Sequence, residues 1–185
     1  GDFALRGGWK LQEARKVAGT ALELSSPGFD SRSWLDATVP GTVLTTLVDR
    51  GIHPEPTYGL DNMAIPESLN REDYWYRNEF TPSRDLAGRT LTLTLNGVNY
   101  AADVWLNGQH VHRHEHVYPQ IPHSVSFQAS LAEGANEFVV RFEAVAARAC
   151  PYVMAFQMVG LAPEAFVFIP TFHEGVARRE TVEKA

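Results

Sequence analysis

Residues 91–95 read Leu-Thr-Leu-Thr-Leu and form the clearest strand signal in the chain. Strict alternation places the leucines on one face and the β-branched threonines on the other, as in a strand with one buried face. A second alternating run occupies residues 137–142, where Phe138, Val140 and Phe142 fall on one face. These two segments predict a protein built from β-sheets.

Further strand and turn signals lie on either side of the first strand. Asn96-Gly97 predicts a turn directly after it. Residues 104–106 predict a short strand, and Asn107-Gly108 is a strong two-residue hairpin signal, with a return strand from about Gln109. Additional strands are expected at residues 8–12, 21–24 and 75–80.

One helix is expected, at residues 42–49. It follows Pro40-Gly41, carries its apolar side chains on one side and stops before Gly51. Residues 52–70 are rich in Pro, Gly and Asn and predict an ordered loop. Many short strands with one short helix favour an all-β sandwich over alternating strands and helices.

Size and composition limit the function classes. The 185 residues suit one domain, and 44% apolar and 21% charged residues are ordinary globular values. A net charge of -6 with scattered basic residues disfavours nucleic acid. No apolar run approaches the roughly 20 residues of a membrane-spanning helix. Cys150 is the single cysteine, so no internal disulfide is possible. Residues 1–4 lack the pattern of a signal peptide, and the compartment stays open.

Five stretches occur in a recognisable order: WLDATVPGTV at 34–43, PEPTYGL at 54–60, NREDYWYR at 70–77, LNGV at 95–98 and ADVWLNG at 102–108. Together they resemble the amino-terminal domain of glycoside hydrolase family 2, nearest the β-mannosidase and exo-β-glucosaminidase branch. The resemblance implies a galactose-binding-like jelly-roll β-sandwich. It makes residues 1–185 a single domain whose last ~35 residues lead toward a following, absent domain. The family's two catalytic glutamates lie in a separate barrel, so we expect no glycoside hydrolysis from this chain alone.

Residues 70–77 combine aromatic rings, on which sugar C–H faces stack, with polar groups that take directed hydrogen bonds. We predict that Asp73, Tyr74 and Trp75 bind sugar, because the resemblance places this stretch near the wall of the barrel's active site. The alternative is that Trp75 and Tyr76 begin a core strand while Arg71, Glu72 and Asp73 pair locally. Trp105, in mid-strand, is expected to be structural.

The tail departs from the pattern of the family. Residues 166–170 read Phe-Val-Phe-Ile-Pro where the branch usually has Trp-Asp-Trp followed by Ile/Gly-Pro. Val167 therefore stands where the resemblance implies a sugar-contacting aspartate, and valine cannot accept a hydroxyl hydrogen bond. Ala177 replaces a tryptophan expected further on.

Residues 110–116 read His-Val-His-Arg-His-Glu-His. Residues two apart on a strand share a face ~6.6–7 Å apart, and neutral imidazoles at that spacing can share zinc or another divalent transition metal. The predicted ligands are His112, His114 and His116, with Glu115, His123 or His173 as further candidates. The alternative is a polar face that binds nothing specific.

The leading hypothesis is a non-catalytic carbohydrate-associated domain that braces a catalytic barrel and lines its sugar pocket. Its partners would be carbohydrate and the remaining domains of a parent glycosidase. The main alternative is a stand-alone metal-binding sandwich that uses the His110–His116 strand. A third possibility is a structural fragment without a ligand. A severed domain interface would expose apolar surface, so weak self-association is expected.

Overall fold

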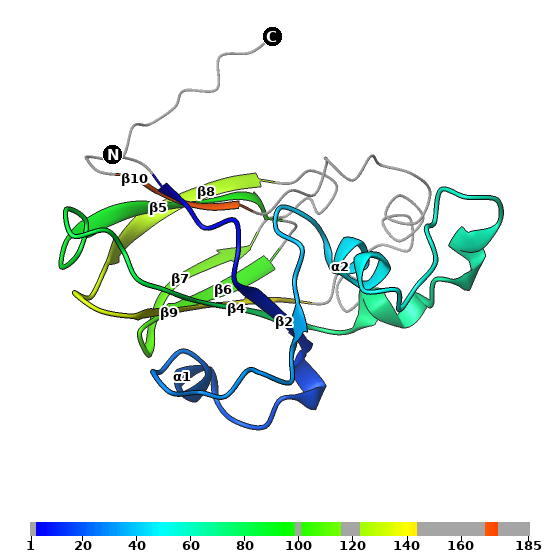
Figure 1. The fold of residues 1–185 in the computed structure, drawn as a ribbon, viewed down its shortest axis with the longest axis horizontal. Coiled ribbons are helices and arrows are strands. Elements are labelled where there is room, and N and C mark those ends of the chain that lie inside the picture. The colour runs from blue at the N-terminus through cyan, green and yellow to red at the C-terminus, as the bar shows by residue number, and fades with distance from the viewer. Residues whose placement is uncertain (1–2, 99–100, 116–122, 144–168, 174–185) are drawn as a thin grey trace, which may run out of the picture.

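The computed structural model describes residues 3–98, 101–115, 123–143 and 169–173, which form two β-sheets packed face to face (Figure 1). All the pairings between described strands are antiparallel. In spatial order, the four-stranded sheet contains β1 (Phe3–Ala4), β10 (Ile169–His173), β5 (Thr90–Val98) and β8 (His123–Ser130). The six-stranded sheet contains β3 (Leu35–Asp36), β2 (Trp9–Glu13), β4 (Tyr74–Phe80), β9 (Asn136–Phe142), β6 (Ala101–Leu106) and β7 (Gln109–Glu115).

Helical segments in the described part of the chain are short. They are η1 (Ala14–Lys16), α1 (Ala21–Leu24), α2 (Val43–Asp49), η2 (Asp61–Ala64) and η3 (Glu67–Arg71). The helix predicted at residues 42–49 is α2, and its first turn is capped by the Thr42 hydroxyl, which accepts from the Thr45 amide at 3.1 Å. The predicted all-β sandwich with one short helix is therefore confirmed. None of these helices is both long and apolar enough to cross a membrane.

Two local predictions were wrong, and each has a physical reason. Residues 21–24 form α1 rather than a strand, because Thr20 and Glu23 make a capping box. The Thr20 amide donates to the Glu23 carboxylate at 2.6 Å, and the Thr20 hydroxyl accepts from the Glu23 amide at 3.3 Å. Asn96-Gly97 does not end a strand, since β5 continues to Val98 through an irregularity in register opposite β8.

The main core lies between the two sheets. The leucines of residues 91–95 point into it from β5, and Phe138 and Val140 meet them from β9, as the alternation predicts. Trp9 of β2 packs edge-to-face on Phe138, with ring centroids 5.6 Å apart.

A second apolar cluster covers part of the outer face of the six-stranded sheet. Trp75 and Val139 are buried there, and Trp105 packs against them, beneath a cover that includes Leu24 and Trp34. This cover is the segment of residues 14–34 that carries α1, seen below β4 and β9 in Figure 1. Its presence divides the outer face into a sealed region and an open region.

Candidate functional site

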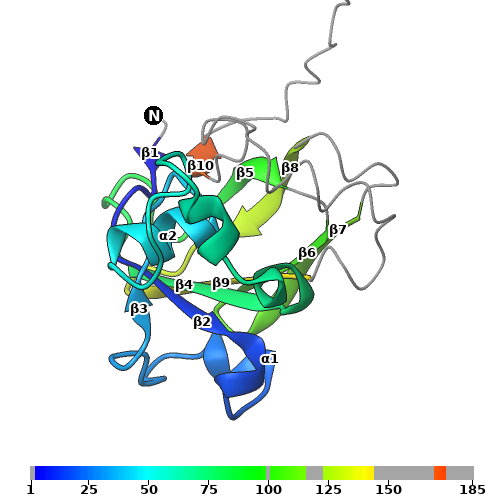
Figure 2. The same cartoon turned by 90° about the vertical axis from the view of Figure 1, so that its right-hand side faces the viewer.

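The open region lies at one end of the six-stranded sheet, which Figure 2 turns toward the viewer. β4 and β6 begin at this end, whereas β9 and β7 finish there, because Tyr74 and Ala102 both pair with Phe142 and Ala101 pairs with Glu115. Antiparallel pairing therefore gathers residues that are far apart in sequence at one edge, such as Asp73 and Glu143, which are 70 positions apart.

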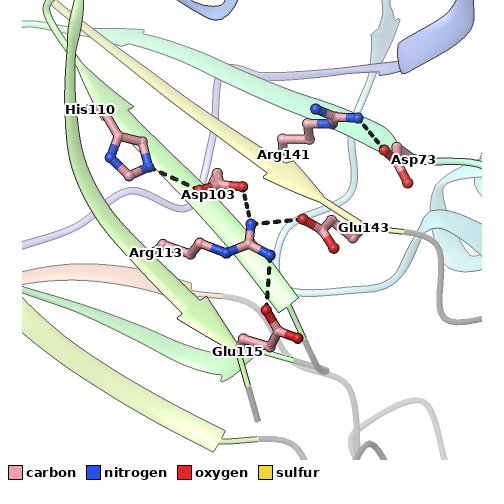
Figure 3. A network of polar contacts seen from close by, with 7 residues as sticks. All are labelled: Asp73, Asp103, His110, Arg113, Glu115, Arg141 and Glu143. Carbon is pink, nitrogen blue, oxygen red and sulfur yellow. Dashed lines mark hydrogen bonds and ion pairs between the residues drawn. The ribbon is translucent and has the colours of Figure 1, made fainter. Parts of the chain in front are cut away.

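A carboxylate network surrounds Arg113 on β7 (Figure 3). Its guanidinium donates to Asp103, to Glu143 at 2.7 Å and to Glu115 at 2.9 Å. The hydrogen bonds that Arg113 donates to Glu143 and Glu115 raise the pKa of its guanidinium, so it stays a cation. His110 Nε2 lies 2.9 Å from Asp103 Oδ1 on the same surface. One arginine thus faces three carboxylates, and this edge of the sheet is locally acidic.

A second ion pair joins Arg141 of β9 to Asp73, just before β4 (Figure 3). The Arg141 guanidinium also lies 5.7 Å from the centre of the Trp75 ring, within cation–π range. Trp75 contacts Trp105 at 5.3 Å between ring centroids, and Trp105 contacts His110 at 5.1 Å. A continuous chain of ionic and aromatic contacts therefore links β4 to β7 across the sheet.

An open pocket of about 390 Å³ lies beside the Asp73–Arg141 pair, within the size range of small-molecule sites. It is lined by Ala14, Arg15, Arg71, Glu72, Asp73 and Arg141. Arg15 is 3.4 Å from Glu72, so the ion pairs Arg15–Glu72 and Arg141–Asp73 both border the pocket. Such walls offer guanidinium donors and carboxylate acceptors side by side, and sugar hydroxyl groups can use both.

The three predicted sugar-binding residues point in different directions. Asp73 lines the pocket. Tyr74 is buried in the main core, where burial raises the pKa of its hydroxyl to about 12, assisted by the charges of Glu13 and Glu72. Trp75 is buried in the second cluster beneath residues 14–34. Sugar contact by these residues stays a prediction, and of the three only Asp73 borders the pocket.

Sequence reasoning missed part of the pocket. Arg15 and Arg141 lie far from residues 70–77 in sequence and belong to no motif, so their approach follows from strand pairing alone. The alternative that Arg71, Glu72 and Asp73 pair locally was incomplete as well. Asp73 pairs with Arg141 across the sheet, and Glu72 pairs with Arg15 from η1.

The histidine strand is β7, but its histidines do not alternate throughout. Trp105 pairs with His110 and Val104 with His112, so Val111 is an extra residue in a bulge. His110 therefore lies on the outer face beside Trp105. Strict alternation would have placed it on the same face as His112 and His114, so that expectation was wrong for His110. His112 and His114 share the inward face, opposite Val104 and Ala102.

The His112 ring stacks on Phe127 of β8, with centroids 4.5 Å apart and planes 7° from parallel. Within the described part of the chain its Nε2 is buried without a hydrogen-bond partner, and burial, with a smaller contribution from His110, lowers the pKa of the imidazole. His116, Val167 and Ala177 lie outside the described residues. Within the described ranges no three potential ligands come together as a metal site, so zinc binding stays a prediction.

The fold is a two-sheet antiparallel β-sandwich, an architecture that includes the jelly rolls of lectin domains. Comparison with known families makes this assignment specific. The chain belongs to the family described as glycosyl hydrolase 2 galactose-binding domain-like, whose model matches residues 9–167. The resemblance noted in the sequence is confirmed.

Relatives of known activity are much longer than this chain. An exo-β-D-glucosaminidase of Streptomyces avermitilis is 33% identical over 137 residues, which cover 74% of this chain and 15% of that protein. A mannosylglycoprotein endo-β-mannosidase of Lilium longiflorum is 32% identical over 65% of this chain and 13% of its own length. The crystal structure of an Amycolatopsis orientalis exo-chitosanase matches 77% of this chain and 16% of its own with a TM-score of 0.63 at 22% identity, which supports the fold.

Proposed function

We propose that this chain is a non-catalytic, carbohydrate-associated domain of a family 2 glycosidase, which braces the catalytic part and forms one wall of its saccharide pocket. The observation that carries the proposal is the open polar pocket bordered by Asp73 and Arg141. Family membership gives that pocket its chemical context, because the matching relatives named above are glycosidases.

Recognition would rest on groups that are already ordered. The Asp73 carboxylate accepts hydrogen bonds from sugar hydroxyls, and Arg141 and Arg71 donate to hydroxyl oxygens. The Asp73–Arg141 ion pair, together with Trp75 beneath the guanidinium, holds both groups in place before a ligand arrives. Pre-organisation of this kind reduces the entropy lost on binding.

Retaining glycosidases need two carboxyl groups ~5–5.5 Å apart, one of them with a raised pKa so that it can act as an acid. Glu137 is the carboxyl whose pKa is raised by burial in the described structure, and its side chain is only 2% exposed, with Arg77 beside it. It does not line the pocket, so it is not placed to act as such an acid there.

Titration of the ¹⁵N-labelled chain with glucosamine, mannose and galactose, followed by NMR, tests the proposal. We expect millimolar glucosamine or mannose to shift the amides near Asp73 and Arg141, and Asp73→Asn to weaken that response. Asp30→Asn is the matched control, because Asp30 is an exposed carboxylate paired with Arg32 at 2.7 Å and does not line the pocket. Absence of shifts with all three sugars, or an equal response from both variants, would contradict the assignment.

A further inference from the structure

A group of exposed apolar side chains projects from the loop after α2. Tyr58 and Leu60 are each 76% exposed and Met63 is 78% exposed. Ile52, at the start of the same loop, is 49% exposed, so four of the five exposed large apolar side chains in the described residues lie between positions 52 and 63. We call Tyr58, Leu60 and Met63 the apolar knob. Concentrated exposure of this kind marks interaction surfaces, whereas scattered apolar residues are ordinary.

The loop that carries the knob is held by successive turns. The amide of Tyr58 donates to the Glu55 carbonyl at 3.2 Å, that of Asp61 to Tyr58 at 3.1 Å, and that of Met63 to Leu60 at 3.0 Å. Gly59 has a φ of +56°, in the left-handed region. Ile65 is buried and anchors the base of the loop. The backbone that carries the apolar side chains is therefore ordered, so docking would not have to order the loop itself.

The charged residues in the loop indicate what kind of partner surface would complement the apolar knob. Residues 51–66 contain Glu55 and Asp61 and no Lys or Arg, whereas Glu67 is paired with Arg71 at 3.4 Å. An apolar tip with the carboxylates of Glu55 and Asp61 beside it in sequence fits an apolar patch rimmed by basic side chains, because interfaces combine a buried apolar core with a polar rim of complementary charge. Tyr and Met are also residue types enriched in interface cores.

The knob and the pocket lie at the same end of the sandwich. In Figure 1 the loop after α2 extends to the right of the sheets, and Figure 2 views that end directly. The loop continues through η3 into β4, and Arg71, the last residue of η3, lines the pocket. A surface that covers the knob is therefore brought to the end of the sandwich where the residues of the pocket lie.

We propose that the apolar knob docks on the remaining, catalytic part of a family 2 glycosidase, at an apolar patch rimmed by basic side chains. This inference rests on the proposed function, and it names the contact that would bring the pocket to the catalytic part. The length of the relatives supplies the partner, since this chain spans 15% and 13% of two proteins that it matches.

Hydroxyl-radical footprinting of the complete gene product that carries this chain, compared with the isolated 185-residue chain, tests the contact. We expect Tyr58, Leu60 and Met63 to be modified several-fold more slowly in the complete gene product. Leu22, 58% exposed on α1, is the internal control and should be modified equally in both. Equal modification of the knob in the two samples would overturn the inference.

Other occupants give different results. Protection of the knob in the isolated chain that grows with concentration, with a dimer in sedimentation, would assign the surface to a second copy. Protection there that is independent of concentration would assign it to the chain's own remaining residues. Either result would overturn the proposed partner. If the knob does not dock but the proposed function holds, the sugar-induced shifts near Asp73 would persist. If the proposed function itself is wrong, those shifts would be absent.

A triple variant, Tyr58→Ser, Leu60→Ser and Met63→Ser, gives an independent measurement. In the parent gene product we expect this domain and the catalytic part to unfold together in one transition. The triple variant should unfold in two separate transitions, whereas Leu22→Ser should keep the single one. Because the knob side chains lie outside the core, the triple variant should leave the melting temperature of the isolated chain nearly unchanged. Coupled unfolding of the triple variant would count against docking through the knob.

Discussion

Arg77 and Arg141 lie on the same face of neighbouring strands, yet their surroundings differ completely. Arg77 is sealed beneath residues 14–34, where its side chain is 4% exposed and its guanidinium reaches Glu137, Ser31 and the Leu24 carbonyl. Arg141 is 40% exposed and borders the open pocket with Asp73. The cover segment of residues 14–34 thus buries the Arg77–Glu137 pair, whereas the Arg141–Asp73 pair stays partly exposed at the pocket.

The largest effect should come from breaking the sealed pair. Arg77→Ala leaves the Glu137 carboxylate buried without its cation, which should lower the free energy of unfolding by about 3–5 kcal/mol. Urea denaturation measures this directly. Arg32→Ala is the control, because Arg32 is 90% exposed, and it should leave stability unchanged. A loss for Arg77→Ala as small as that of the control would show that residues 14–34 do not seal the pair.

Replacing both Arg77 and Glu137 separates the effect of the buried charge from the effect of packing. Arg77→Met combined with Glu137→Leu removes both buried charges and keeps apolar volume, so it should recover most of the stability lost by Arg77→Ala. The same urea experiment compares the two. A double variant as unstable as Arg77→Ala would mean that packing around Arg77, and not charge, dominates its contribution.

The open pair should matter much less for stability. Arg141→Ala is expected to cost no more than ~1 kcal/mol, because a partly exposed ion pair is screened by solvent. It should nevertheless weaken the response to glucosamine or mannose, since it removes a donor from the pocket wall. A destabilisation as large as that of Arg77→Ala, with an unchanged sugar response, would reverse the roles assigned to the two arginines.

His112 gives a smaller, pH-dependent effect. Its pKa is lowered in the folded state by burial against Phe127, so the unfolded chain binds more protons. The resulting stability is present above the unfolded pKa of about 6.5 and is lost as pH falls below it. His112→Leu should therefore flatten the decline in unfolding free energy between pH 7.5 and pH 5.5, whereas His53→Asn should not. Identical slopes of unfolding free energy against pH in the parent, His112→Leu and His53→Asn would show that His112 does not cause the decline.

The zinc hypothesis predicts the smallest and most conditional effect. If His112, His114 and His116 bind Zn²⁺, the ion raises the melting temperature, because it binds the native state. His112→Ala and His114→Ala should each abolish that rise. A melting temperature that Zn²⁺ leaves unchanged, or an equal rise in both variants, would leave the histidines as a polar face.

Much of the fold could be predicted because alternation is a local property. Residues 91–95 and 137–142 show their buried faces directly, and Asn107-Gly108 marks its hairpin. The errors arose where local signals competed. The capping box at Thr20 made a helix from residues 21–24, and a bulge at Val111 moved His110 to the other face.

The site was harder to predict because its residues meet only through strand pairing. Asp73 could be found within residues 70–77, but Arg141 joins it from a strand that lies 68 positions later in sequence. A core strand that includes Trp75 was one of the two predictions for this stretch. That Tyr74 and Trp75 are buried in two different cores could not be seen locally, because the second core needs the cover of residues 14–34. Likeness to a family supplied the context for the pocket, whereas its geometry required the structure.

The most direct test of the central claim is the hydrolysis of p-nitrophenyl β-glucosaminide and β-mannoside by the complete gene product. If the Asp73 pocket is one wall of the saccharide site, Asp73→Asn should raise KM for the substrate that is cleaved while kcat stays near that of the parent, because it removes binding energy that the ground state and the transition state share equally. Asp30→Asn should change neither constant. Absence of hydrolysis of both substrates, or an unchanged KM in Asp73→Asn, would contradict the account.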